Sequence, residues 1–237
     1  MTRRRAALLL LPALAVGGCA TVQPPAPAAP PPARALSAAE LRAAAVTASD
    51  LGGGYTVTLM NPQAGGPAPG APRQLADVPA CQPVLDAIGP ADPTATPQAE
   101  TDLTTAPAGH PQTLLYTALL GYPAGRSTEL QSGLDQVLAK CTDFTSGVPG
   151  QSKAARTRHQ LVRADTPTPG GADAATAFTL TSGPQAGGSE LTQRAAVVRV
   201  GTALAVFSTV GSAKEPAAVP DPVVVQAQTR KLRAAQG

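Results

Sequence analysis

The segment from residue 194 to residue 210 constrains the fold more strongly than any other part of the sequence. It reads RAAVVRVGTALAVFSTV, two apolar runs separated by Gly201 and Thr202. A two-residue loop with glycine first is typical of a type II′ turn, which joins two antiparallel strands. Because both runs are apolar on both faces, we expect them at the centre of a sheet.

The other expected elements follow from apolar periodicity and capping residues. Ser37 and Glu40 form a capping box, with Leu36 and Leu41 at the staple positions, so a helix is expected from Ser37 to about Ala48. Further helices are expected over 77–88, from Thr128 with Gln131 completing a capping box, and from Asp221–Pro222. Strands are expected over 55–60, 99–105, 113–122, 154–164 and 174–181. This order predicts an α+β domain with a largely antiparallel sheet and helices packed against it.

The N-terminus has the pattern of an export signal. Arginines at positions 3–5 precede an apolar stretch over 6–16 and the small residues Gly17 and Gly18. The apolar stretch is shorter than the roughly 20 residues that span a bilayer. Val-Gly-Gly-Cys, ending at Cys19, resembles the lipobox of bacterial lipoproteins, in which the cysteine thiol accepts a diacylglyceryl group. The alternative is an ordinary signal peptide cleaved after Ala20, with Cys19 incidental.

A segment rich in proline and alanine follows Cys19 and extends to about residue 36. Such a composition favours extended polyproline II, which rises ~3.1 Å per residue, so 17 residues reach roughly 50 Å. We interpret it as a semi-rigid spacer between a lipid anchor and a domain. The alternative is a proline-rich ligand for another protein.

Charge excludes one class of partner. The chain has 18 basic and 15 acidic residues, and the three arginines of residues 1–18 account for the net charge of +3. The remaining chain is neutral. Its one basic cluster has no aromatic residues interleaved, so we interpret it as a solvated strand edge and expect no nucleic-acid binding; it consists of Lys153, Arg156, Arg158 and Arg163. Aromatic residues make up only 3% of the chain, which argues against recognition by stacking.

Two cysteines remain besides Cys19. Cys81 and Cys141 lie on the apolar faces of two expected helices. Because an exported chain meets an oxidising environment, we expect these two to form a disulfide. The alternative is a pair of buried free thiols.

The motifs of catalysis are missing. The sequence contains no G-x-S-x-G, H-E-x-x-H or P-loop, and His110 and His159 lack metal-ligand spacing. We therefore expect no cofactor, no metal and no enzyme activity. A hydrolase with a polar triad around His159 is the least favoured alternative, and we expect His159 to be a solvent-facing strand residue.

Several short stretches carry a family resemblance: 47–55 (TASDLGGGY), ACQPVLDAI around Cys81, LAKCTDFT around Cys141, and VRVGTALAVFS. Together they resemble the extracellular sensor domain of mycobacterial PknH-type Ser/Thr kinases, which also occurs in actinobacterial lipoproteins. The resemblance covers about residues 37–235. It implies an α+β domain with a bent antiparallel sheet and a cleft for a ligand. The chain departs from the kinase sensors in having cysteines for one disulfide rather than two.

These observations predict a lipoprotein with a signal peptide over 1–18, a lipidated Cys19 and spacer over 19–36, and a sensor-type domain over 37–237. We expect it on the extracytoplasmic face of the cell membrane. Its domain is expected to bind a small or envelope-derived ligand in a sheet-lined cleft, with Tyr116, Arg158 and His159 as candidate lining residues. Because the sequence shows no kinase domain or transmembrane helix, any signal is expected to pass to a separate protein partner. The alternative function is an envelope interaction or structural lipoprotein, marked by an exposed apolar patch in place of a cleft.

Overall fold

The structure, a computed structural model, describes residues 34–60, 73–88, 96–110, 112–150, 152–184 and 187–237. Cys19 and the expected signal peptide lie outside the described residues, as does all but the end of the spacer. The described residues, from Arg34 to Gly237, belong to one compact unit. Every residue of its two apolar cores lies at or after Leu36, so the unit contains its whole core.

The described elements alternate between short helices and strands. The helices are α1 (Ala38–Ala44), η1 (Pro79–Cys81), α2 (Gln82–Ile88), α3 (Arg126–Leu138), η3 (Lys153–Ala155) and α4 (Pro222–Gln236). The strands are β1 (Tyr55–Leu59), β2 (Leu75–Ala76), β3 (Ala99–Pro107), β4 (Leu115–Gly121), β5 (Asp143–Gly147), β6 (Thr157–Ala164), β7 (Ala174–Pro184), β8 (Leu191–Val200) and β9 (Ala203–Ser212).

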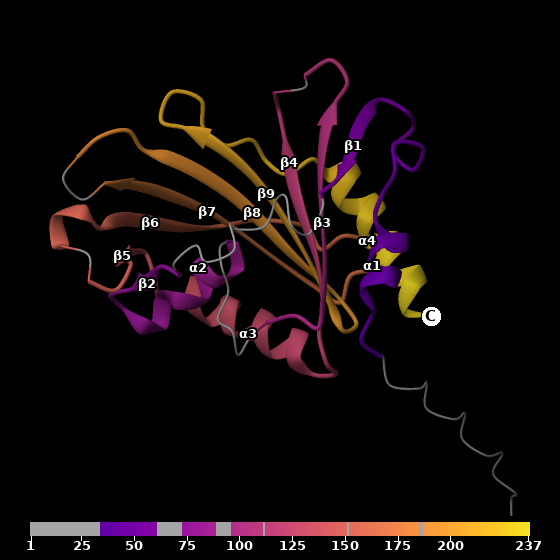
Figure 1. Cartoon of the computed structure of the whole chain (residues 1–237), viewed down its shortest axis with the longest axis horizontal. Coiled ribbons are helices and arrows are strands. Elements are labelled where there is room, and N and C mark those ends of the chain that lie inside the picture. The colour runs from indigo at the N-terminus through magenta and orange to yellow at the C-terminus, as the bar shows by residue number, and fades with distance from the viewer. Residues whose placement is uncertain (1–33, 61–72, 89–95, 111, 151, 185–186) are drawn as a thin grey trace, which may run out of the picture. The chain divides into compact units, whose positions relative to one another are not determined.

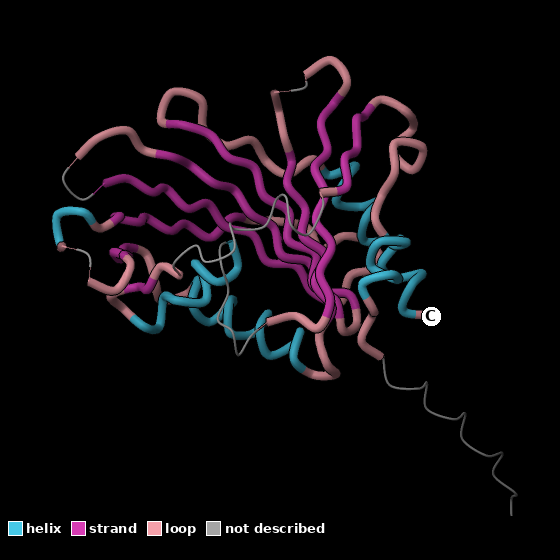
Figure 2. The backbone as a smooth tube through the Cα atoms, viewed as in Figure 1, coloured by secondary structure: helices cyan, strands magenta, loops and turns pink. Residues whose placement is uncertain are grey.

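All nine strands belong to one open sheet, in the order β1-β3-β4-β9-β8-β7-β6-β5-β2, and every neighbouring pair is antiparallel. The strand directions rotate from β6 to β4, so the sheet is twisted and bent (Figure 2). The α+β prediction is therefore confirmed, and β8 and β9 lie near the middle of the sheet.

The turn between β8 and β9 also has the expected form. Val200 pairs with Ala203, which leaves a two-residue loop. Gly201 has φ of 57°. Thr202 has a negative φ, as does every other non-glycine residue among those described. Positive φ at the first position alone is the signature of a type II′ turn.

Helices cover opposite faces of the sheet (Figure 1). On one face, α1 and α4 pack over β3, β4, β8 and β9 to form the first core, which includes Leu41, Leu103, Phe207 and Leu232. On the other face, α2 and α3 pack over β5 to β9 to form the second core. Successive residues of β8 and β9 alternate between the two cores, which explains why both strands are apolar on both faces.

Helix α1 begins as expected but ends earlier. Ser37 and Glu40 form the complete capping box. The helix stops at Ala44 instead of near Ala48, because Asp50 accepts hydrogen bonds from the amide and hydroxyl of Thr47 and holds that segment in turns. Side chains of this kind compete with helical hydrogen bonding.

The expected start of the third helix is wrong. Helix α3 begins at Arg126, after Gly125 with φ of 84°, and has no side-chain cap. The expected capping partner Gln131 instead donates a hydrogen bond to Thr176 on β7. A tertiary contact therefore replaces the local capping box.

Two strands that the sequence pattern did not predict, β2 and β5, complete the sheet beyond β6. Neither has a recognisable strand pattern, because β2 has two residues and β5 has little apolar character. Within the described part of the chain, no helix is long and apolar enough to cross a membrane.

Candidate binding surfaces

The three candidate residues do not form one site. Arg158 and His159 are neighbours on β6, so their side chains point to opposite faces of the sheet. Tyr116 shares the face of His159 but lies on β4, four strands away. At about 4.8 Å per strand, the two are separated by roughly 19 Å along the sheet.

His159 is 3% exposed, so the expectation of a solvent-facing histidine is wrong. Its Nε2 lies 2.7 Å from the hydroxyl of Ser146, its Nδ1 lies 2.8 Å from that of Ser182, and its ring stacks on Phe144 at 4.8 Å. Ser146 and Phe144 come from β5, a strand that the sequence pattern did not predict. The buried position of His159 could therefore not be recognised from the sequence.

The directions of these hydrogen bonds follow from Gln74. The hydroxyl of Ser146 donates to the side-chain oxygen of Gln74 at 2.7 Å, because that oxygen can only accept. Ser146 must then accept from Nε2–H of His159, which leaves Nδ1 to accept from Ser182. Burial lowers the pKa of His159 to about 4, although the carboxylate of Asp77 acts in the opposite sense. The imidazole is neutral near pH 7.

This polarity is unsuited to nucleophilic catalysis. A base that activates a serine must accept the hydroxyl proton, whereas His159 donates to Ser146. Ser146 is also fully buried. The arrangement satisfies polar groups inside the second core, as buried polar groups require.

Arg158 lies on the opposite face, is exposed, and forms an ion pair with Asp143 at 3.6 Å. Around it, the surface presents Gln160, Thr179 and Arg194, with the guanidinium of Arg194 donating to Thr179 at 3.3 Å. This side of β6 to β8 is a mixed polar surface.

Tyr116 belongs to an exposed apolar surface that we call the β4–β9–β8 patch, formed by Tyr116, Val210 and Leu191. These side chains are 39%, 55% and 56% exposed. Strand pairing puts them on one face: Tyr116 is opposite Ser208, Val210 is opposite Gln193, and Leu191 is opposite Ser212. The patch and its pairing partners carry no charge. It lies at the ends of β4, β8 and β9 that point away from α3 (Figure 1).

Sequence reasoning found Tyr116 but missed Val210 and Leu191. The hairpin turn at Gly201–Thr202 fixes the register of β8 and β9, so the shared face of Val210 and Leu191 was within reach of the sequence. Their exposure could not be predicted, because the sequence does not show which end of that face α2 and α3 leave uncovered.

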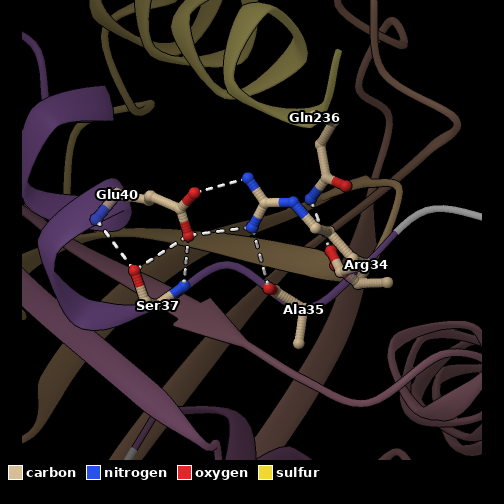
Figure 3. Close-up of polar contacts among 6 residues, drawn as sticks. Arg34, Ala35, Ser37, Glu40 and Gln236 are labelled. Atoms are coloured by element: carbon tan, nitrogen blue, oxygen red, sulfur yellow. Dashed lines mark hydrogen bonds and ion pairs between the residues drawn. The ribbon is translucent and has the colours of Figure 1, made fainter.

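Several elements hold the first described residue, Arg34, in place (Figure 3). The guanidinium of Arg34 pairs with Glu40 of the capping box. The hydroxyl of Thr202 donates to the carbonyl of Arg34 at 2.7 Å and accepts from the side chain of Gln236 at 3.2 Å. The β8–β9 turn and both terminal helices thus fix the direction of the chain at residue 34.

Among the described residues, no three His, Cys, Asp or Glu side chains gather as a metal site requires. Asp102 lies on β3, on the same face as Tyr116 and two residues along the strand from Thr104, which pairs with Tyr116. Burial raises the pKa of the Asp102 carboxyl group. This carboxylate adjoins the β4–β9–β8 patch on the side of β1.

No family model matches the chain. No curated protein matches it either. Among solved structures, the X-ray structure of an uncharacterised protein from Mycobacterium smegmatis, an ortholog of Rv0999, is similar at 12% identity. That similarity covers 85% of this chain and 98% of the other, with a TM-score of 0.42. A resemblance of this strength carries no argument about function.

Proposed function

We propose that this chain is a lipid-anchored protein of the extracytoplasmic face of the cell membrane, whose domain binds a partner and catalyses no reaction. The anchor is Cys19, and the proline-rich segment after it acts as a spacer. Support comes from the Val-Gly-Gly-Cys sequence behind a short apolar segment.

The β4–β9–β8 patch is the observation that favours a binding role. Exposed apolar side chains gathered on one face mark interaction surfaces more often than single exposed residues do. Its lack of charge fits the neutral balance of the chain after residue 18. It favours the envelope interaction protein, whose partner would present an uncharged apolar surface.

A ligand-sensing role is the second candidate, because of the resemblance to PknH-type sensor domains. In that case the same patch would bind an uncharged apolar part of an envelope lipid or cell-wall fragment. The separate signalling protein would then recognise the liganded domain.

The anchor is tested with Cys19→Ala in the full chain. We expect this variant to lose the lipid, remain unprocessed and fail to partition into detergent as the mature form. A variant that is processed and membrane-bound like the parent would show that Cys19 is not the anchor.

The binding surface is tested with a matched pair of variants. Val210→Lys puts a charge in the patch, whereas Val162→Lys puts the same charge on β6 at a residue that is 58% exposed. In a thermal-shift screen against cell-wall and lipid fragments, a ligand at 100 times its dissociation constant should stabilise the parent by ~2.7 kcal/mol. We expect Val210→Lys to abolish that shift and Val162→Lys to retain it.

A blank screen combined with co-purification of a stable protein partner would favour the interaction protein. Retention of that partner by Val210→Lys would show that the patch is not the surface that binds it.

A further inference from the structure

The two edges of the open sheet differ in how their outward main-chain groups are satisfied. At one edge, β2 is two residues long. The outward amide of Ala76 donates to the side chain of Gln82 at 2.8 Å, and the same side chain donates to the carbonyl of Gln74 at 3.0 Å. One glutamine side chain thus bonds two outward main-chain groups at this edge.

At the other edge, β1 is five residues long and pairs with β3 alone. Met60 donates to the carbonyl of Asp102 at 2.8 Å, and Ala108 donates to that of Gly54 at 3.0 Å. These bonds flank the strand and show that its even-numbered residues face β3, since main-chain groups alternate along an antiparallel strand.

The odd-numbered residues Tyr55, Val57 and Leu59 therefore direct their amides and carbonyls away from the sheet. Across the described ranges, these six main-chain groups have no hydrogen-bond partner within the protein. A row of unpaired groups on an edge strand is a template for another strand.

Strand β1 also lacks the features that usually protect an edge. Its sequence, Tyr-Thr-Val-Thr-Leu, contains no charge, no proline and no bulge, and each residue is paired in register with β3. The side chain of Leu59 is 47% exposed. Threonine and valine favour the extended conformation, so the strand is ready to pair.

We propose that β1 is an interface for a second copy of this chain, in which two β1 strands pair antiparallel about a two-fold axis at Val57. In this register, Val57 faces Val57 of the second copy and Tyr55 faces Leu59. All six outward groups of each strand then find partners. A shift of two residues in either direction leaves one outward residue of each strand unpaired.

The sequence of β1 is self-complementary in this arrangement. An aromatic residue faces an aliphatic one on one face, and Thr56 faces Thr58 on the other, both favourable cross-strand pairs. No like charges meet across the axis. A two-fold contact uses the same surface twice, so the contact is closed and does not grow into a fibre.

The contact is small beside the 1,200–2,000 Å² that stable interfaces typically bury, so its main-chain hydrogen bonds must supply the specificity. We expect a weak dimer, visible in solution at concentrations up to about 1 mM. This inference does not depend on the proposed function.

Residues 34–237 contain both cores and are the protein to measure. Their mass in solution, followed by sedimentation against concentration, should approach that of a dimer. Leu59→Lys should weaken dimerisation at least tenfold, because the lysine faces Tyr55 of the second copy. Val162→Lys should leave it unchanged. A parent that stays monomeric throughout, or a dimer that survives Leu59→Lys, would overturn the proposal.

The register has its own test. Residues 34–237 contain no cysteine except the bonded pair Cys81–Cys141, so an introduced thiol is the only free one. Directly paired residues have Cα atoms about 5.5 Å apart, within the range of a disulfide. Val57→Cys should therefore cross-link under oxidation, whereas Thr58→Cys, which faces Thr56, should not. Cross-linking at position 58, or at neither position, would show that this register is wrong.

Discussion

The two cores of this domain are closed in different ways. Over one face of the sheet, the 15-residue helix α4 packs against α1, and a buried glutamine, Gln228, fastens the two. Over the other face, the seven-residue helix α2 packs against α3, and a disulfide joins the two sides. A helix of seven residues is too short to be stable without tertiary support. Helix α1 is equally short. Each core therefore holds one seven-residue helix by a different means: the buried side chain of Gln228 for α1, and the covalent link beside α2.

The first prediction removes the disulfide. Cys81 and Cys141 are bonded, with Cα atoms 5.8 Å apart and a sequence separation of 60 positions. Closing a loop of that size constrains the unfolded chain by ~4 kcal/mol in the entropy model. The double variant Cys81→Ala, Cys141→Ala should lose about that much unfolding free energy, measured by urea denaturation.

Hydrogen exchange locates this loss. The slowest amides of both helices report global unfolding, so their protection should fall by about the same ~4 kcal/mol. Amides of α2 that exchange by local opening should lose additional protection, and a total change below about 1 kcal/mol would contradict the stabilising role of the disulfide.

The second prediction concerns how the unfolding free energy depends on pH through His159, which lies on the same face of the sheet as the second core. Burial lowers the pKa of His159 to about 4 in the folded protein, whereas its ordinary value in the unfolded chain is near 6.5, so between these pH values the unfolded chain binds the extra proton. Unfolding free energy should therefore fall as pH drops from about 6.5 towards 4, by up to about 3 kcal/mol. His159→Gln should remove this dependence.

Burial raises the pKa of Glu100 and Asp102, which acts in the opposite direction over the same pH range. The difference between the parent and His159→Gln isolates the histidine, because both proteins retain the carboxylates. Parallel pH profiles for the two proteins would refute the assignment.

The third prediction compares two glutamines of α4. Gln228 is fully buried and bonds the amide of Val46 at 3.0 Å and the carbonyl of Ala44 at 2.8 Å. Gln226 makes the same two bonds to Gly170, at 3.0 and 2.9 Å, but nearer to solvent. Gln228→Ala should cost about 2–3 kcal/mol, because two buried main-chain groups lose their partner.

Gln226→Ala is the matched control. Water can replace its bonds, so its cost should stay below about 1 kcal/mol. Thermal or urea unfolding of the two variants measures the difference. Equal losses of unfolding free energy in the two variants would mean that burial does not determine how much these glutamine hydrogen bonds contribute to stability.

The smallest expected effect is at an ion pair on the same helix. Lys231 lies 2.7 Å from Asp50, and that hydrogen bond, together with those from Thr47, lowers the pKa of Asp50 to about 2. Lys231→Met should cost about 0.5–1 kcal/mol at low salt. The difference should shrink in high salt, which screens a pair near the surface. A loss of several kcal/mol of unfolding free energy would show that this ion pair contributes much more to stability than a pair near the surface should.

Local patterns were sufficient wherever a neighbouring residue decided the outcome. Ser37 and Glu40 predicted the start of α1, Asp221 and Pro222 predicted that of α4, and Gly201 predicted the hairpin. The two apolar runs placed β8 and β9 near the centre of the sheet, because a strand that is apolar on both faces must be covered on both.

Distant contacts decided the rest. The start of α3 could not be predicted, because Gln131 bonds to β7 instead of to its own helix. The burial of His159 depends on β5, whose sequence carries too little periodicity to be assigned as a strand. The same holds for the uncovered end of the sheet at Val210, since it depends on how far α2 and α3 extend over the strands.

The sequence by itself determined the α+β class, the central hairpin and the cysteines that could pair, because each depends on residue type and spacing along the chain. Only the tertiary structure decided which polar residues are buried, which apolar residues are exposed and which edge of the sheet is open. Those outcomes depend on strand order and helix placement, which bring together residues up to 184 positions apart, as at Ala44 and Gln228.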